Sequence, residues 1–323
     1  MSEHPVTPVY AFDPELAEMA AAVALNPPMT DPVAARERTT EMLAMMGIEI
    51  DVSDLDIDDR TVPGPPGDPD VAVRVYAPKA RVAGVPGILY IHGGGFVTGS
   101  IETEHANAAR LAQSLGVVVV SVEYRLAPEH PFPAALEDCY AALVWLHKES
   151  AALGVDSERI AINGGSAGGG LAAGLALLAR DRGGPAICFQ YLGIPELDDR
   201  LETPSMQRFH DTPMWSRPQA ERSWKWYLGD AYGSADVSPY AAPARATDVA
   251  GLPPAYISTM EFDPLRDEGI QYALKLLAAG VSVELHSYPG TFHGSAIVTT
   301  AAITRREGAE RITVLRRALG LDD

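Results

Sequence analysis

Residues 161–170 read AINGGSAGGG, in which five glycines surround a single serine, Ser166. The residues before the serine are apolar and β-branched, as in a strand covering 159–164, and a helical pattern covers 167–183. Three interpretations compete for this stretch. It could bind a phosphate, it could be a tight turn that only allows close packing, or it could present the serine as a nucleophile.

The residues exclude the phosphate-binding interpretation. A P-loop requires G-x-x-x-x-G-K-[ST], and no lysine follows the glycines here. A looser G-x-G-x-x-A pattern at Gly168, Gly170 and Ala173 lies inside the expected helix rather than at its start. No acid suited to bind a ribose follows about 20 residues later.

The remaining pattern is G-x-S-x-G, from Gly164 to Gly168. A serine raised above a sheet between a strand and a helix lies in a strained turn, so we expect a positive φ at Ser166. The two backbones then approach each other two residues before and after the serine, which favours glycine at 164 and 168. With 29 glycines in 323 residues, about one such chain in seven contains this pattern by chance, so its weight comes from its place between a strand and a helix.

Along the rest of the chain, short β-branched runs alternate with longer helical patterns. The expected strands cover 71–78, 87–92, 117–124, 159–164, 186–193, 254–260 and 281–289, and the expected helices cover 105–116, 133–154, 167–183, 264–280 and 301–320. Alternation of this kind, with nearly all-apolar strands, predicts an α/β fold whose mainly parallel sheet is covered on both faces.

Two regions interrupt the alternation. Residues 1–48 contain two helical patterns with no strand between them, and residues 204–232 are inserted between two expected strands. The insertion holds Trp215, Trp224 and Trp226, three of the four tryptophans. It could be a small satellite core, but its place near exposed strand ends favours a cap whose aromatic side chains line an apolar pocket.

A nucleophilic serine needs a base, and the base needs an acid to orient it. Of the histidines that follow Ser166, His210 lies in the insertion and His286 lies within a strand, where a structural role is favoured. His293 follows the last expected strand in a glycine-flanked loop (YPGTFHGS), where an imidazole can reach the serine. We therefore predict His293 as the base.

The segment ISTMEFDPLRDEG supplies four candidate acids, which are Glu261, Asp263, Asp267 and Glu268. Asp263 closely follows an expected strand and precedes Pro264, which suits the first turn of a helix. Its place at the end of a strand favours a role in a site, although it can also cap the helix. Asp267 and Glu268, a helical turn further on, are predicted to be surface or ion-pair residues.

Charge that develops on a substrate oxygen needs backbone donors, and the residue after the serine, Ala167, is one candidate. The segment HGGGF (92–96) follows an expected strand and offers others, because three glycines leave the backbone N–H groups unshielded. We predict that His92 holds this loop in place.

Composition limits the possible partners. The net charge of −18 argues against nucleic acid and anionic membranes as partners. The longest apolar run has the length of a strand, and residues 1–19 show no signal-peptide pattern, so a cytoplasmic protein is expected. Cys139 and Cys188 look like small core residues rather than a disulfide pair, and no zinc-ligand spacing is present.

Five motifs occur in a fixed order along the chain: HGGGF, YRLAPEHPFPAALED (124–138), GGSAGG, EFDPLRDEG and YPGTFHG. Together they resemble the hormone-sensitive-lipase-like group of bacterial carboxylesterases, within the α/β-hydrolase superfamily. The resemblance spans about residues 70–300. It departs from the family at Gly165, where an aspartate or a threonine is usual.

The resemblance implies a mostly parallel eight-stranded sheet with helices on both faces and a helical cap. Residues 1–48 and 204–232 would form the cap, and residues 49–203 and 233–323 would form the two parts of the core. It implies a catalytic triad of Ser166, His293 and Asp263, and no cofactor or metal. The oxyanion hole would comprise Gly94, Gly95 and Ala167, with Gly93 adjacent.

The function expected from these residues is hydrolysis of small-molecule carboxylic esters with short to medium acyl chains through an acyl-enzyme. Phe96 and Trp215 are the candidate substrate-binding residues, and a homodimer is expected because members of this group often dimerise. An amidase, deacetylase or β-lactam-type hydrolase would use the same triad. A ligand receptor without activity is the alternative outside enzymes, and the presence of His293 argues against it.

Overall fold

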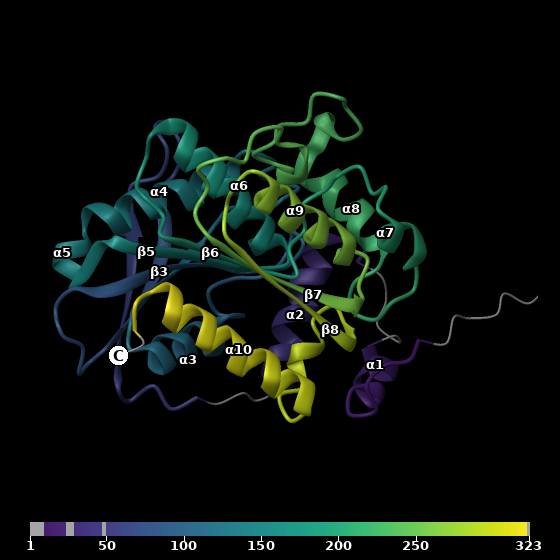
Figure 1. The fold of residues 1–323 in the computed structure, drawn as a ribbon, viewed down its shortest axis with the longest axis horizontal. Helices are drawn as coiled ribbons and strands as arrows, with labels where there is room; N and C mark the ends of the chain where they lie inside the picture. Colours follow the sequence, from purple (N-terminus) through teal and green to yellow (C-terminus); the bar gives the residue numbers. More distant parts are fainter. Residues whose placement is uncertain (1–9, 24–28, 47–49, 322–323) are drawn as a thin grey trace, which may run out of the picture.

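One eight-stranded sheet organises the computed structural model, which describes residues 10–23, 29–46 and 50–321 (Figure 1). The strand order is β1-β2-β4-β3-β5-β6-β7-β8. Strand β2 pairs antiparallel with β1 and with β4, and all other neighbours are parallel. The strands are β1 (Leu55–Val62), β2 (Val71–Pro78), β3 (Val85–Ile91), β4 (Val118–Glu123), β5 (Val155–Gly165), β6 (Phe189–Gly193), β7 (Ala255–Phe262) and β8 (Val283–Phe292). The predicted mostly parallel eight-stranded sheet is confirmed.

Helices cover both faces of this sheet (Figure 1). One face carries α4 (Ala134–Lys148), α6 (Ala167–Arg182) and α9 (Arg266–Ala278), and the other carries α3 (His105–Leu115) and α10 (Ala302–Ala318). Each face has its own cluster of buried apolar side chains. The central strand β3 is buried along its whole length, which explains its unbroken apolar sequence, because a strand covered on both faces has no polar side.

Strand β1 is the element that the sequence pattern did not predict. Its sequence, LDIDDRTV, is buried only at its two ends, and it pairs with β2 alone at the edge of the sheet. An edge strand that faces water carries charged side chains, which protect it against pairing with other chains. Its four charged residues therefore hid the strand from a search for apolar alternation.

The two segments outside the alternating pattern lie beside each other. Helices α1 (Ala17–Val23) and α2 (Pro32–Met46) come from the first, and α7 (Pro204–Arg208), α8 (Arg217–Leu228) and the 3₁₀ turn η1 (Gly229–Ala231) from the second. Leu16 and Phe209 belong to one buried cluster, and the Tyr10 hydroxyl donates to Asp211 Oδ1 at 2.5 Å. Residues 1–9, 24–28 and 47–48 of the predicted N-terminal unit lie outside the described residues.

The remaining helical elements are short. They are α5 (Ser150–Leu153) and the 3₁₀ turns η2 (Pro243–Arg245) and η3 (Ser295–Ile297). Within the residues that the structure describes, no helix combines the length and the apolar character that crossing a membrane requires.

Candidate active site

Ser166 lies between the end of β5 and the start of α6, with φ 56° and ψ −124°. The positive φ predicted from the sequence is therefore present. A Cβ atom added at Gly164 would lie 2.1 Å from Gly168 O, and one added at Gly168 would lie 2.2 Å from Ile91 O. No side chain fits at such distances, so both glycines are required by the close approach of strand and helix. This turn holds the serine above the carboxyl ends of the parallel strands.

His293 and Asp263 reach the serine from the two neighbouring strand ends. Asp263 directly follows β7, and His293 directly follows β8. Ser166 Oγ lies 2.9 Å from His293 Nε2, and His293 Nδ1 lies 2.7 Å from Asp263 Oδ2. Because a carboxylate only accepts hydrogen bonds, Nδ1 carries the proton and leaves Nε2 free to accept from the serine hydroxyl.

The other candidate histidines lie away from this arrangement. His210 Nε2 lies 2.9 Å from Gln207 O on the exposed side of the insertion. His286 lies within β8, where its Nε2 is 3.4 Å from Glu284 Oε1 and its Nδ1 is 3.9 Å from Glu310 Oε1. Of the three histidines considered from the sequence, His293 is the one hydrogen-bonded to Ser166.

Asp263 is almost fully buried, and its two oxygens have separate partners. Oδ1 accepts from Leu265 N at 2.9 Å, so this oxygen holds the turn that leads into α9, while Oδ2 faces His293. Asp263 therefore contacts both His293 and the start of α9, the two places that the sequence analysis considered for it. Asp267 pairs with Arg266, as predicted.

The prediction for Glu268 was wrong. Its side chain is 1 % exposed, and its Oε1 accepts hydrogen bonds from Leu197 N at 2.6 Å and from Asp198 N at 3.3 Å. Burial raises the pKa of Glu268 well above its ordinary value, although the bond from Leu197 N acts in the opposite direction. The side chain points inward because it supplies an acceptor for backbone N–H groups that follow β6, which helical spacing does not reveal.

The glycine-rich loop that follows β3 lies next to the serine turn. A Cβ atom at Gly93 would lie 3.5 Å from Ser166 Cβ. Gly94 and Gly95 have φ values of 119° and 59°, which favour glycine. Within the described part of the chain, the backbone N–H groups of Gly94, Gly95 and Ala167 donate no hydrogen bond to another backbone group, so they are available to an oxygen held near the serine.

His92 anchors this loop rather than acting as a base. Its ring stacks on Tyr124 at 4.0 Å between centroids, and its Nδ1 lies 2.8 Å from Gly93 O. Burial lowers the pKa of His92 to about 4, although the bond to Gly93 acts in the opposite direction. The ring is therefore neutral near pH 7, and its Nδ1–H donates to the Gly93 carbonyl.

The two predicted substrate-binding residues occupy different positions. The Trp215 ring lies 5.8 Å from the His293 ring, and its Cη2 would be 2.6 Å from a Cβ at Gly95. It therefore borders both the base and the glycine loop. Phe96 has φ 61° and stacks on Tyr227 of α8 at 4.0 Å, so it joins the loop to the insertion.

Two residues that sequence reasoning missed contact the same loops. Ser223 of α8 donates from Oγ to Gly95 O at 2.9 Å. Glu196 N donates to Ser166 O at 3.1 Å. A serine in the middle of a helix and a glutamate in a loop carry no recognisable spacing, so the sequence offered no signal for either residue.

Glu284, His286 and Glu310 are the group of described residues that could hold a metal ion, because their ligand atoms lie within 4.8 Å of one another. The two ring nitrogens of His286 face different carboxylates. Neither nitrogen therefore faces both acids, and the group lies on β8 and α10, apart from Ser166.

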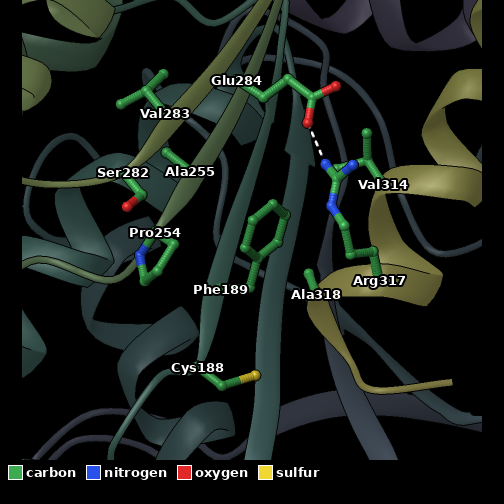
Figure 2. Close-up of a pocket in the computed structure, with 10 residues that line it drawn as sticks. All are labelled: Cys188, Phe189, Pro254, Ala255, Ser282, Val283, Glu284, Val314, Arg317 and Ala318. Carbon is green, nitrogen blue, oxygen red and sulfur yellow. Dashed lines mark hydrogen bonds and ion pairs between the residues drawn. The ribbon is translucent and has the colours of Figure 1, made fainter. Parts of the chain in front are cut away.

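A cavity of about 300 Å³ lies at the other end of the strands from Ser166. Figure 2 shows Phe189, Ala255 and Val283, which begin β6, β7 and β8, around it. Glu284 and Arg317 form an ion pair across its rim. Because these strands are parallel to β5, the cavity faces the amino ends of the strands, whereas Ser166 lies at the carboxyl ends. Cys188 also lines this cavity, so it is only partly buried, unlike Cys139.

The chain is similar to known proteins over most of its length. Residues 88–297 match the model of a family described by its alpha/beta hydrolase fold. The chain is 42% identical over 276 residues to carboxylesterase NlhH of Mycobacterium tuberculosis, covering 82% of this chain and 84% of that protein. It is 40% identical over 288 residues to esterase LipI of the same organism, covering 88% of each. A solved structure of a bacterial heroin esterase is 52% identical, with a TM-score of 0.92, covering 96% of this chain and 98% of that one.

Proposed function

Because the chain belongs to the hormone-sensitive-lipase-like family of α/β hydrolases and is a carboxylesterase, we propose that it cleaves esters through a triad of Ser166, His293 and Asp263. The observation that carries this proposal is the continuous series of hydrogen bonds from the serine hydroxyl through the imidazole to the buried carboxylate. This series supplies a nucleophile, a base and an orienting acid in the order that acyl transfer requires.

In the proposed reaction, His293 Nε2 takes the proton of Ser166 as Oγ attacks the ester carbonyl. Asp263 holds the tautomer of His293 and stabilises the imidazolium that forms. The imidazolium then protonates the departing alcohol, which leaves the acyl group on Ser166. A water molecule, activated by the same imidazole, hydrolyses this acyl-enzyme and restores the serine.

We propose that the N–H groups of Gly94, Gly95 and Ala167 bind the oxygen that becomes negative in each tetrahedral intermediate, with Gly93 beside them. These N–H groups donate to no other backbone group of the described residues, which supports this role. The start of α6 adds the favourable end of its dipole, because Ala167 is its first residue. Loss of one such donor typically raises the barrier by about 3 kcal/mol.

We propose a small-molecule ester with a short to medium acyl chain as the substrate. Trp215, which lies beside His293 and the glycine loop, and Phe96, which belongs to that loop, would bind it, and both are almost fully buried. The relatives named above are an esterase, a carboxylesterase and a heroin esterase, which supports ester substrates in general.

We further propose that residues 204–232 and the N-terminal segment together form a cap over the site. The packing of Leu16 and Phe209 in one cluster and the position of Trp215 over His293 support this assignment. The expected homodimer and cytoplasmic location stay predictions.

Matched substrates test ester hydrolysis against the amidase alternative. We expect p-nitrophenyl acetate to be turned over with a kcat/KM at least about 1,000-fold above that of p-nitroacetanilide, because an amide needs stronger protonation of its leaving group. The measurement is the release of the chromophore by each substrate at pH 7.5. Equal or faster turnover of the anilide would instead assign the chain as an amidase.

A further inference from the structure

Ser223 connects the insertion to the glycine loop. It lies in α8 with no exposed surface, and its Oγ donates to Gly95 O at 2.9 Å. Gly95 and the next residue, Phe96, have φ values of 59° and 61°. A phenylalanine in this left-handed region is strained and keeps its conformation only where the surroundings hold it. The bond from Ser223 fixes the peptide plane between these two residues.

Glu196 contacts the serine turn through its backbone. Its N–H donates to Ser166 O at 3.1 Å, and its carbonyl oxygen lies 2.1 Å from where a Cβ of Gly170 would be. Its backbone is therefore fixed against the first turn of α6. Its side chain has no exposed surface, and neither carboxyl oxygen has a hydrogen-bond partner among the described residues.

The groups that face the Glu196 carboxyl disfavour a negative charge on it. Burial raises the pKa of Glu196 from its ordinary value of 4.5 to about 8, the neighbouring Ser223 hydroxyl lowers it, and the Asp263 carboxylate raises it. Glu268 of α9 and Tyr227 of α8 also interact electrostatically with Glu196, and both are acids. A buried carboxyl in such surroundings keeps its proton.

The number of protons on the Ser223 hydroxyl and the Glu196 carboxyl group determines which hydrogen bonds the two can form. A serine hydroxyl has one proton, and Ser223 gives it to Gly95 O. Its oxygen can therefore only accept a second hydrogen bond. A carboxylate has no proton to give, whereas a neutral carboxylic acid has one. Only protonated Glu196 can bond to Ser223 while the bond to Gly95 persists.

We propose that Glu196, carrying its proton, donates to Ser223 Oγ after a rotation of its carboxyl group, and that both are positioning residues for the Gly95–Phe96 peptide, which directly follows the proposed oxyanion donor Gly95 N–H. This inference rests on the proposed function, since it assigns Gly95 to the oxyanion hole. When Glu196 loses its proton, the Ser223 hydroxyl turns toward the carboxylate and releases Gly95 O. The rate of acyl transfer then falls as the pH rises through the ionisation of Glu196.

The test measures kcat and KM for p-nitrophenyl acetate between pH 6 and 10 in the full chain and three variants. Ser223→Ala is expected to lower kcat at pH 7 about tenfold, with KM within about twofold, and to lose the alkaline decline. Glu196→Gln keeps a neutral donor at every pH, so its ratio of kcat at pH 9.5 to kcat at pH 7 is expected to exceed that of the unmodified chain about fivefold or more. Ser216→Ala removes the hydroxyl of the residue that precedes the same helix, one that donates to Gln219, and is expected to behave as the unmodified chain.

Folding and reactivity are followed separately. Thermal unfolding by circular dichroism reports whether each variant folds, and a fluorophosphonate probe reports whether Ser166 reacts. If the unmodified chain neither reacts with the probe nor turns over the ester, the proposed function has failed. If it does both, but the folded Ser223→Ala variant keeps kcat within twofold or Glu196→Gln keeps the full alkaline decline, only the positioning role is overturned.

Discussion

Gly165 is the residue in the serine turn where the chain departs from its family. A Cβ atom added there would meet only Gly193 O, at 4.0 Å, whereas one added at Gly164 would lie 2.1 Å from a backbone carbonyl oxygen. Of these neighbouring glycines, only Gly164 is required by close packing. Gly165 is therefore not required by close packing at its Cβ position, and nothing in the structure explains the absence of the aspartate or threonine that the family resemblance leads us to expect there.

This difference predicts opposite outcomes for two alanine variants. Gly165→Ala is expected to keep kcat within about twofold and to raise the free energy of unfolding by up to about 1 kcal/mol, because alanine restricts the unfolded chain. Gly164→Ala is expected to lower that free energy by about 3 kcal/mol or more, because strand and helix must move apart. Urea unfolding and ester turnover measure both effects. Equal behaviour of the two variants would contradict this account of the turn.

The sequence was informative about the residues whose chemistry needs a fixed local pattern. Ser166 and His293 could be selected because each is flanked by glycine at the end of an expected strand. Glu196 and Ser223 could not, because their contacts depend on how a loop and a distant helix fold against the serine turn. Glu268 was misjudged for the same reason, since its partners lie about seventy residues away.

At the scale of elements, helix α2 is joined to two loops by one side chain. Arg36 Nε donates to Val97 O at 2.8 Å, and its Nη2 donates to Ala127 O at 2.8 Å. The same guanidinium pairs with both carboxylate oxygens of Glu129 at 2.9 and 2.7 Å. Val97 directly follows the loop that holds the proposed oxyanion donors, so α2 helps to fix that loop from outside the sheet.

We expect Arg36→Ala to lower the free energy of unfolding by about 2 kcal/mol, because two carbonyl groups and a carboxylate lose their donor. Turnover is expected to fall as well, because the loop after β3 becomes less ordered. Arg38→Ala, on the same helix, is the matched control, since the described residues show no hydrogen bond for that side chain. If the two variants unfold at the same urea concentration, Arg36 does not anchor the helix.

The sequence predicted the elements whose apolar residues follow the period of a strand or a helix and are buried in the fold. The apolar runs of the central strands and the long helical patterns on both faces lie close to their expected positions. Strand β1 was missed because its charged side chains face water at the edge of the sheet. Alternation of apolar residues measures burial rather than pairing, so a solvated edge strand gives no such signal.

For the whole molecule, buried acids make stability depend on pH. Glu268 ionises near 4.5 in the unfolded chain, but burial raises its pKa in the folded protein. Between these two values the folded protein binds one proton more than the unfolded chain, so stability falls as the pH rises. Glu196 acts in the same direction up to about pH 8.

We expect Glu268→Gln to reduce this decline between pH 5 and pH 8. One proton contributes about 1.4 kcal/mol per pH unit, so the free energy of unfolding of the variant should gain on that of the unmodified chain by more than about 1 kcal/mol across the interval. Groups present in both chains contribute equally to the pH dependence of the two free energies of unfolding, so their contributions cancel in the comparison. They include His92, whose lowered pKa changes stability in the opposite direction as the pH rises. Parallel pH curves from urea unfolding would show that Glu268 is ionised in the folded state.

Covalent labelling tests most directly whether Ser166 is the nucleophile of this ester hydrolase. After reaction with a fluorophosphonate, peptide mass spectrometry should place one adduct on Ser166. The Ser166→Ala variant should fold and remain unlabelled. Its turnover of p-nitrophenyl acetate should be at least about 10,000-fold slower than that of the unmodified chain. An adduct on another residue, or a Ser166→Ala variant that keeps a tenth or more of the activity, would contradict the account.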